Sequence, residues 1–133
     1  MRNARILVIE DTPANLELVT DLLEAAGHRV LSATAAEPGM EIARLERPDL
    51  ILMDVSLPGM DGLEATRRLR ADQATADIPV VALTAHAMHG DESLALQAGC
   101  RIHITKPIDT RTFVRRVIEV LNPRDSERPD PRR

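Results

Sequence analysis

Residues 47–64 read RPDLILMDVSLPGMDGLE, and this stretch decides the fold of the chain. Its centre, LILM, is an unbroken apolar run, which predicts a strand covered on both faces. The run ends at Asp54, a loop with Pro58 and Gly59 follows, and apolar residues at helical spacing begin at Leu63. The stretch therefore predicts a strand, a loop and a helix, the unit from which parallel sheets are built.

The same alternation continues in both directions from this stretch. Further apolar runs predict strands at 6–9, 30–31, 78–83 and 102–104. Segments with apolar residues at helical spacing occur at 16–26, 40–45, 63–69, 93–98 and 113–121. Strands that alternate with helices predict a doubly wound α/β domain, a (βα)5 fold with a five-stranded parallel sheet between two helix layers and right-handed crossovers.

The chain length sets the number of domains. With 133 residues there is room for one domain with a proper core, and we expect it to occupy residues 1–121. That core must be aliphatic, because the chain has one Phe and neither Tyr nor Trp. Residues 122–133 contain three prolines and no apolar residue, so we expect a flexible tail there.

Composition also excludes several classes of function. A net charge of −4 provides no general attraction for nucleic acid, and without aromatic faces bases cannot stack on the protein. The apolar start at 6–9 is cut off by Glu10 and Asp11, so it is too short for a secretory signal or a membrane span. The single Cys100 cannot form an internal disulfide. We expect a cytoplasmic protein that binds neither nucleic acid nor membrane.

Polar residues follow most of the predicted strands. Glu10 and Asp11 follow the first strand, Asp54 the third, Thr84 the fourth and Lys106 the fifth. Because ligands collect at the carboxyl ends of parallel strands, these side chains are predicted to share one edge of the sheet. Three carboxylates would repel one another, which Mg²⁺ relieves, while a hydroxyl and an ammonium suit a phosphoryl group. The set fits a site that forms an aspartyl-phosphate.

Each residue alone has a simpler interpretation. Glu10 and Asp11, before Thr12, could serve to cap the following helix, Thr84 could cap another, and Lys106 could be a surface lysine. Asp54 could belong to a Pro-Gly turn. The conjunction at one edge favours the shared site.

Four stretches carry a family resemblance: ILVIEDTPANLELVTDLLEAAG, the central stretch quoted above, IPVVALTAHAM and AGCRIHITKPI. Together they resemble the response-regulator receiver domain, with its CheY-like fold related to flavodoxin. The resemblance covers residues 4–121, and the local sequence is similar to that of single-domain regulators of the DivK type. The resemblance implies that Asp54 is the phosphoacceptor. It also implies a Mg²⁺ site in which Asp11 binds directly, Glu10 acts largely through water, and the Ser56 carbonyl completes the set.

The resemblance assigns a switch as well. Thr84 would hydrogen-bond a phosphoryl oxygen and move inward, Lys106 would pair with the phosphoryl group, and Pro107 would follow in a cis bond. His103 departs from the family, in which Tyr or Phe is usual, so coupling through that aromatic ring is in doubt. A tolerated, half-exposed imidazole and a pH sensor both stay open.

Other residues near the site could tune it. Ser56 and His86 would modulate phosphate lifetime by controlling the access of water. His86 and His89 lie three apart, but no cysteine or carboxylate pattern completes a zinc site with them.

The expected function is phosphorelay signalling. A sensor histidine kinase or a histidine phosphotransfer protein would donate the phosphoryl group, and a downstream protein would read the result. Weak autodephosphorylation is expected, without metabolic catalysis. A phosphorylation-dependent homodimer stays open.

A small phosphohydrolase or flavodoxin-like nucleotide binder is the main rival. The acidic first loop offers no phosphate cradle, however, and no further base is evident. A binding-only scaffold would not need Asp11, Asp54, Thr84 and Lys106 together.

Overall fold

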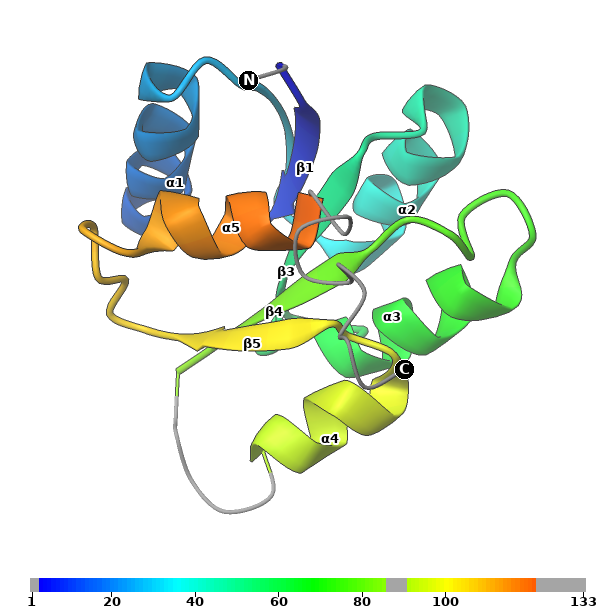
Figure 1. The fold of residues 1–133 in the computed structure, drawn as a ribbon. Coiled ribbons are helices and arrows are strands. Elements are labelled where there is room, and N and C mark those ends of the chain that lie inside the picture. The colour runs from blue at the N-terminus through cyan, green and yellow to red at the C-terminus, as the bar shows by residue number, and fades with distance from the viewer. Residues whose placement is uncertain (1–2, 86–90, 122–133) are drawn as a thin grey trace, which may run out of the picture.

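The computed structural model describes residues 3–85 and 91–121. Strands and helices alternate along this part of the chain, as Figure 1 shows. The strands are β1 (Arg5–Ile9), β2 (Arg29–Ala33), β3 (Leu50–Asp54), β4 (Val80–Thr84) and β5 (Ile102–Thr105). The helices are α1 (Pro13–Ala25), α2 (Ala36–Glu46), α3 (Gly62–Ala71), α4 (Asp91–Ala98) and α5 (Phe113–Leu121).

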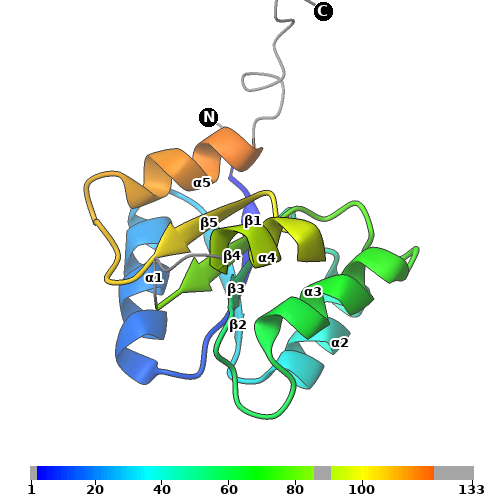
Figure 2. The same cartoon turned by 90° about the horizontal axis from the view of Figure 1, so that it is seen from below.

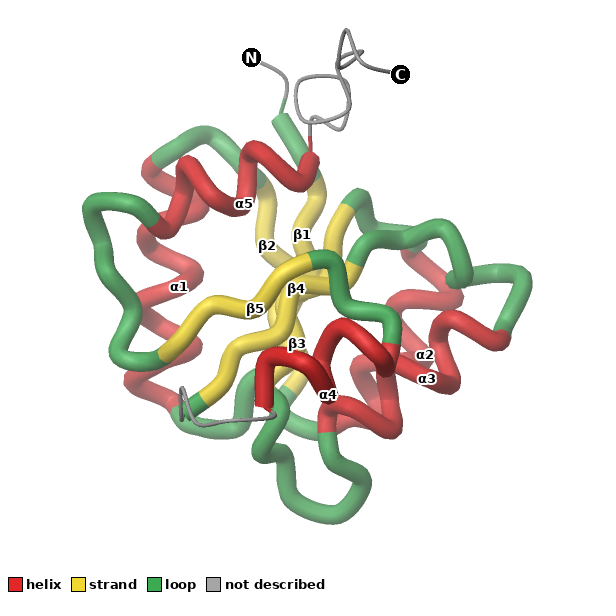
Figure 3. Tube along the Cα trace, turned by 60° about the horizontal axis from the view of Figure 1, so that its bottom comes forward, coloured by secondary structure: helices red, strands yellow, loops and turns green. Residues whose placement is uncertain are grey.

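The strands form one parallel sheet in the order β2-β1-β3-β4-β5. Helices α1 and α5 cover one face, and α2, α3 and α4 cover the other, as seen end-on in Figure 2 and in the tube of Figure 3. The predicted three-layer (βα)5 fold is confirmed. Because all strands point the same way, their carboxyl ends lie along a single edge.

Two separate cores lie on the two faces of the sheet. Successive residues of β1 alternate between them: Leu7 and Ile9 face α2, α3 and α4, while Ile6 and Val8 face α1 and α5. All four side chains are fully buried. Burial on both faces explains why the central strands have unbroken apolar sequences.

Helix α2 begins earlier than its apolar pattern predicts. It starts at Ala36, four residues before Met40, and holds Pro38 in its first turn, where a missing N–H costs little. Gly39 is buried against Ile9, whose side chain occupies the space that a Cβ would need.

Three predictions lie wholly or partly outside the described residues. The tail at 122–133, His86 and most of the loop after β4 belong to this group. The domain boundary at 121 stays a prediction. Every helix described is too short or too polar to cross a lipid bilayer.

Candidate functional site

The five side chains predicted from the strand ends all lie at one edge of the sheet. Glu10 and Asp11 follow β1, Asp54 is the last residue of β3, Thr84 is the last of β4, and Lys106 follows β5. Their positions follow from the parallel topology, since each apolar strand runs through the core and ends at this edge. We refer to it as the carboxyl edge.

Three carboxylates form a compact acidic cluster at this edge. Glu10, Asp11 and Asp54 each offer a carboxylate oxygen, and these oxygens lie within 4.8 Å of one another. Glu10 and Asp54 are buried, whereas Asp11 is exposed. Carboxylates at a site that still reaches solvent through one member fit a hard divalent cation that keeps part of its water shell, as Mg²⁺ does.

Lys106 is the cation that faces this cluster. Its Nζ is 2.9 Å from Glu10 Oε1 and 3.4 Å from Asp54 Oδ1, and only 15% of its side chain is exposed. The contact with Glu10 is an ion pair without aligned hydrogen-bond geometry. Lys106 is therefore not an ordinary surface lysine. One ammonium cannot balance three carboxylates, so the edge keeps a negative excess that a divalent cation would neutralise.

The carboxyl group of Asp54 is held in a fixed orientation. Its Oδ1 accepts a hydrogen bond of 2.9 Å from the backbone N–H of Ser56. Burial raises the pKa of Asp54 above its ordinary value, and the charge of Glu10 adds to the rise, while the Ser56 N–H and Lys106 act against it. The charged form of this group is thus costly without a further positive charge.

Thr84 places a buried hydroxyl group at the carboxyl edge. Its side chain is 3% exposed, and its Oγ1 has no hydrogen-bond partner among the described residues. Its Oγ1 therefore makes no capping bond to a described backbone N–H. A buried hydroxyl that lacks a described partner can donate a hydrogen bond to a ligand at this edge.

The start of α1 settles the capping interpretation of Glu10. Thr12 occupies the N-cap position but makes no side-chain capping bond, and Pro13 opens the helix. Instead, Glu10 Oε2 accepts a hydrogen bond of 3.2 Å from the Thr12 N–H. Glu10 therefore supports the helix start with one oxygen and faces Lys106 with the other.

Of the residues predicted as switch or modulators, Thr84 and Ser56 lie at the carboxyl edge, whereas His103 pairs with Ala82 in the middle of β4. Ser56 is exposed, and His103 is half-buried on β5 with its carbonyl accepting from Arg116 Nη2 at 3.0 Å. The Lys106–Pro107 bond is cis, as predicted. His86 lies outside the described residues.

The junction between the β3–α3 loop and α3 holds a residue that was not predicted from the sequence. Gly62, the first residue of α3, lies so close to Asp54 that a Cβ would collide with the Asp54 carbonyl oxygen. Asp61 caps this helix, its Oδ1 accepting from Glu64 N at 2.8 Å. The signal was available: an Asp N-cap followed by a glycine where a better helix former would be expected.

Two groups of basic side chains are not part of the site. Arg67 and Arg68 are exposed and pair with Glu64 at 3.1 and 3.0 Å, as expected for a solvated face. His28 is buried at the opposite end of the sheet, where its Nδ1 accepts from Ala4 N at 3.1 Å.

Comparison with known proteins agrees with this geometry. The family model of the response regulator receiver domain matches residues 6–118. The polar-differentiation response regulator DivK of Brucella anthropi is 41% identical over 116 residues, which are 87% of this chain and 94% of that protein. The same regulator of Brucella ovis is 40% identical over equal lengths.

Two solved structures share the fold. A putative response regulator from Chloroflexus aurantiacus has a TM-score of 0.86 at 28% identity, covering 90% of this chain and 98% of its own. The receiver domain of a sensor histidine kinase from Pseudomonas aeruginosa has a TM-score of 0.81 at 34% identity with the same coverage. That structure holds a magnesium ion in its active-site cleft.

Proposed function

We propose, from the premise that this chain belongs to the response-regulator receiver domain family, that Asp54 is the residue that accepts the phosphoryl group. The place of the chain in two-component phosphorelay signalling follows from its family. Asp54 is supported as the acceptor by its position in the acidic cluster beside Lys106, with a carboxyl group oriented by Ser56.

The metal site is part of the proposal. Asp11 and Asp54 would hold Mg²⁺ directly, with Glu10 acting largely through water and the Ser56 carbonyl as a further ligand. The ion, when bound, supplies positive charge that neutralises the acidic cluster and the phosphoryl oxygens. The observation that carries this part is the cluster itself, three carboxylates opposed by one ammonium.

The chemistry is an in-line displacement. A carboxylate oxygen of Asp54 forms a bond to phosphorus as the bond from phosphorus to the donor nitrogen of a phosphohistidine breaks, and the imidazole leaves with that electron pair. Lys106 then pairs with a phosphoryl oxygen. The Thr84 hydroxyl donates a hydrogen bond to another, which would give the buried Oγ1 a partner that it lacks among the described residues.

The partners follow from the donor chemistry. A sensor histidine kinase or a histidine phosphotransfer protein would supply the phosphoryl group, and a downstream protein would bind the phosphorylated form. Residues 1–121 would form the folded receiver, acting in the cytoplasm. Switching through Thr84 and His103, modulation by Ser56 and His86, slow autodephosphorylation and a phosphorylated homodimer belong to the same proposal.

The test uses two aspartates that flank one strand. Asp54 ends β3, and Asp49 precedes it at the opposite edge. Intact-mass spectrometry after incubation with acetyl phosphate and Mg²⁺ should give one phosphoryl adduct for the wild type and for Asp49→Ala. Asp54→Ala, and the wild type without Mg²⁺, should give none. No adduct on the wild type, with acetyl phosphate and with a phosphohistidine donor alike, would reject the proposal.

A further inference from the structure

Gly62 is in contact with the backbone of Asp54. Besides the collision with the carbonyl oxygen, a Cβ on Gly62 would lie 2.9 Å from the Asp54 carbonyl carbon and 2.9 Å from Met53 Cγ. A carbonyl group cannot rotate away as a side chain can. Any residue larger than glycine at this position must therefore displace either the start of α3 or the peptide of Asp54.

Two hydrogen bonds restrain Gly62 at the start of α3, and a third restrains Thr66. The Gly62 N–H donates to Val55 O at 3.1 Å, which closes the β3–α3 loop. The Gly62 carbonyl accepts from Thr66 Oγ1 at 2.8 Å, and Thr66 in turn accepts from Cys100 Sγ at 3.8 Å. Thr66 and Cys100 are both buried. Because Gly62 is bonded to Val55, the residue after Asp54, any displacement at Gly62 would be shared by the Asp54 peptide.

We propose that Gly62 is a positioning residue that sets the location of the Asp54 carboxylate relative to Lys106 and the acidic cluster. The inference rests on the proposed function, because it names what holds the phosphoacceptor in place. Asp54 Oδ1 is tied to the Ser56 N–H at 2.9 Å, so a shift of the Asp54 peptide also shifts the carboxylate. In-line phosphoryl transfer is sensitive to displacements of about 1 Å, which can cost about 100-fold in rate.

A second glycine supplies the matched control. Gly39 is also buried in the first part of a helix, and it also packs against a strand that leads into the site. A Cβ there would collide with the Ile9 side chain, 2.7 Å from Cγ1, and not with backbone. Gly39→Ala should therefore lower stability by repacking Ile9 while leaving the backbone of the site in place.

The experiment compares full-length wild type, Gly62→Ala and Gly39→Ala under conditions where circular dichroism shows each to be folded. The rate of phosphoryl uptake from acetyl phosphate is measured by intact mass with saturating Mg²⁺. Gly62→Ala should be about 10–100-fold slower, and Gly39→Ala should stay within about threefold of wild type. An uptake rate for Gly62→Ala equal to that of wild type would overturn the inference while leaving the proposed function intact.

A measurement without phosphorylation separates the two proposals. In ¹H–¹⁵N spectra, Gly62→Ala should shift the amide resonances of Val55 and Ser56 and weaken Mg²⁺ binding, even if the wild type accepted no phosphoryl group. Unchanged amide resonances and Mg²⁺ affinity would reject the positioning role by themselves.

If Gly62→Ala does not fold, Thr66→Val takes its place. Valine keeps the shape of the side chain but removes the bond to the Gly62 carbonyl, so uptake should slow by a few-fold. Thr75→Val is its control, because Thr75 Oγ1 bonds instead to Leu69 O at 2.7 Å. Equal uptake rates for the two threonine variants would overturn the inference.

Discussion

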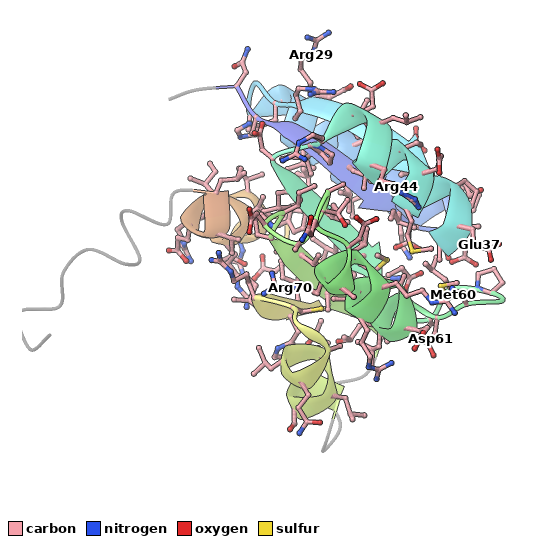
Figure 4. The ribbon with its side chains drawn as sticks, turned by 90° about the vertical axis from the view of Figure 1, so that its right-hand side faces the viewer. Arg29, Glu37, Arg44, Met60, Asp61 and Arg70 are labelled. Atoms are coloured by element: carbon pink, nitrogen blue, oxygen red, sulfur yellow. The ribbon has the colours of Figure 1, made fainter. Side chains whose placement is uncertain are left out.

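The polar groups at the two ends of the sheet differ in whether they have hydrogen-bond and ion-pair partners among the described residues. At the end where the strands begin, Arg5 N donates to Asp49 Oδ2 at 2.8 Å, and Arg5 Nη2 pairs with Glu46 at 2.7 Å. We call this end the amino edge. At the carboxyl edge, Thr84 Oγ1 is buried without a hydrogen-bond partner among the described residues, and like charges of Glu10 and Asp54 face each other. Figure 4 sets the two ends apart, with Arg29 at one and Met60 and Asp61 at the other.

The difference separates groups that hold the fold together from groups kept ready for a ligand. Polar side chains at the amino edge are mostly satisfied within the chain, with one exception, since the buried His28 Nε2 has no partner among the described residues. The carboxyl edge holds carboxylate acceptors in excess and a hydroxyl without a partner among the described residues. Such groups lower stability until a ligand binds them, which is typical of functional sites.

The largest expected effect is on Asp54. Asp54→Asn should raise the metal-free free energy of unfolding by about 1–3 kcal/mol, because it removes one of two buried like charges. Urea unfolding followed by circular dichroism measures this change, since the chain has no Trp. Mg²⁺ at about 100 times its dissociation constant should stabilise the wild type by about 2.7 kcal/mol and the variant much less.

Asp49→Asn is the counterpart at the amino edge. Asp49 accepts the Arg5 N–H, so weakening this bond should lower stability by about 1 kcal/mol with the Mg²⁺ response unchanged. A stabilised Asp49→Asn, or a destabilised Asp54→Asn, would remove the contrast between the edges.

Two buried threonines should respond with opposite signs. Thr84→Val replaces a hydroxyl that has no partner in the described part of the chain by a methyl group and should raise stability by about 1 kcal/mol. Thr75→Val removes the bond to Leu69 O and leaves that carbonyl unsatisfied, so it should lower stability by about 1 kcal/mol. Thermal and urea unfolding of both variants check this, and a loss of stability in both would mean that Thr84 is already satisfied.

The smallest effect belongs to the exposed ion pair at the amino edge. Arg5 and Glu46 have side chains 39% and 52% exposed, so Glu46→Ala should cost less than about 1 kcal/mol, and less still at high salt. Mg²⁺ affinity should not change. A change in the free energy of unfolding as large as the one expected for Asp54→Asn, about 1–3 kcal/mol, would show that the amino edge is more than a solvated surface.

The fold and most of the carboxyl edge could be predicted because the three central strands, β1, β3 and β4, are apolar over nearly their whole length. Each strand identifies its own end, and parallel topology brings Asp54, Thr84 and Lys106 together. The division between a buried Glu10 and an exposed Asp11 could not be predicted, since neighbouring acids look alike in sequence. The Asp61 N-cap before a glycine drew attention to Gly62 only weakly, because the close contact with Asp54 arises only when β3 and α3 pack together.

The pairing of Lys106 with Glu10 makes completion of the carboxyl edge depend on the last strand of the sheet. The two residues follow the last and the first strand, so their contact closes only after β5 has joined β4. A chain still emerging from the ribosome holds Glu10, Asp11 and Asp54 long before Lys106 is made. The site that we propose to accept the phosphoryl group is therefore complete only when β5 is in place beside β4.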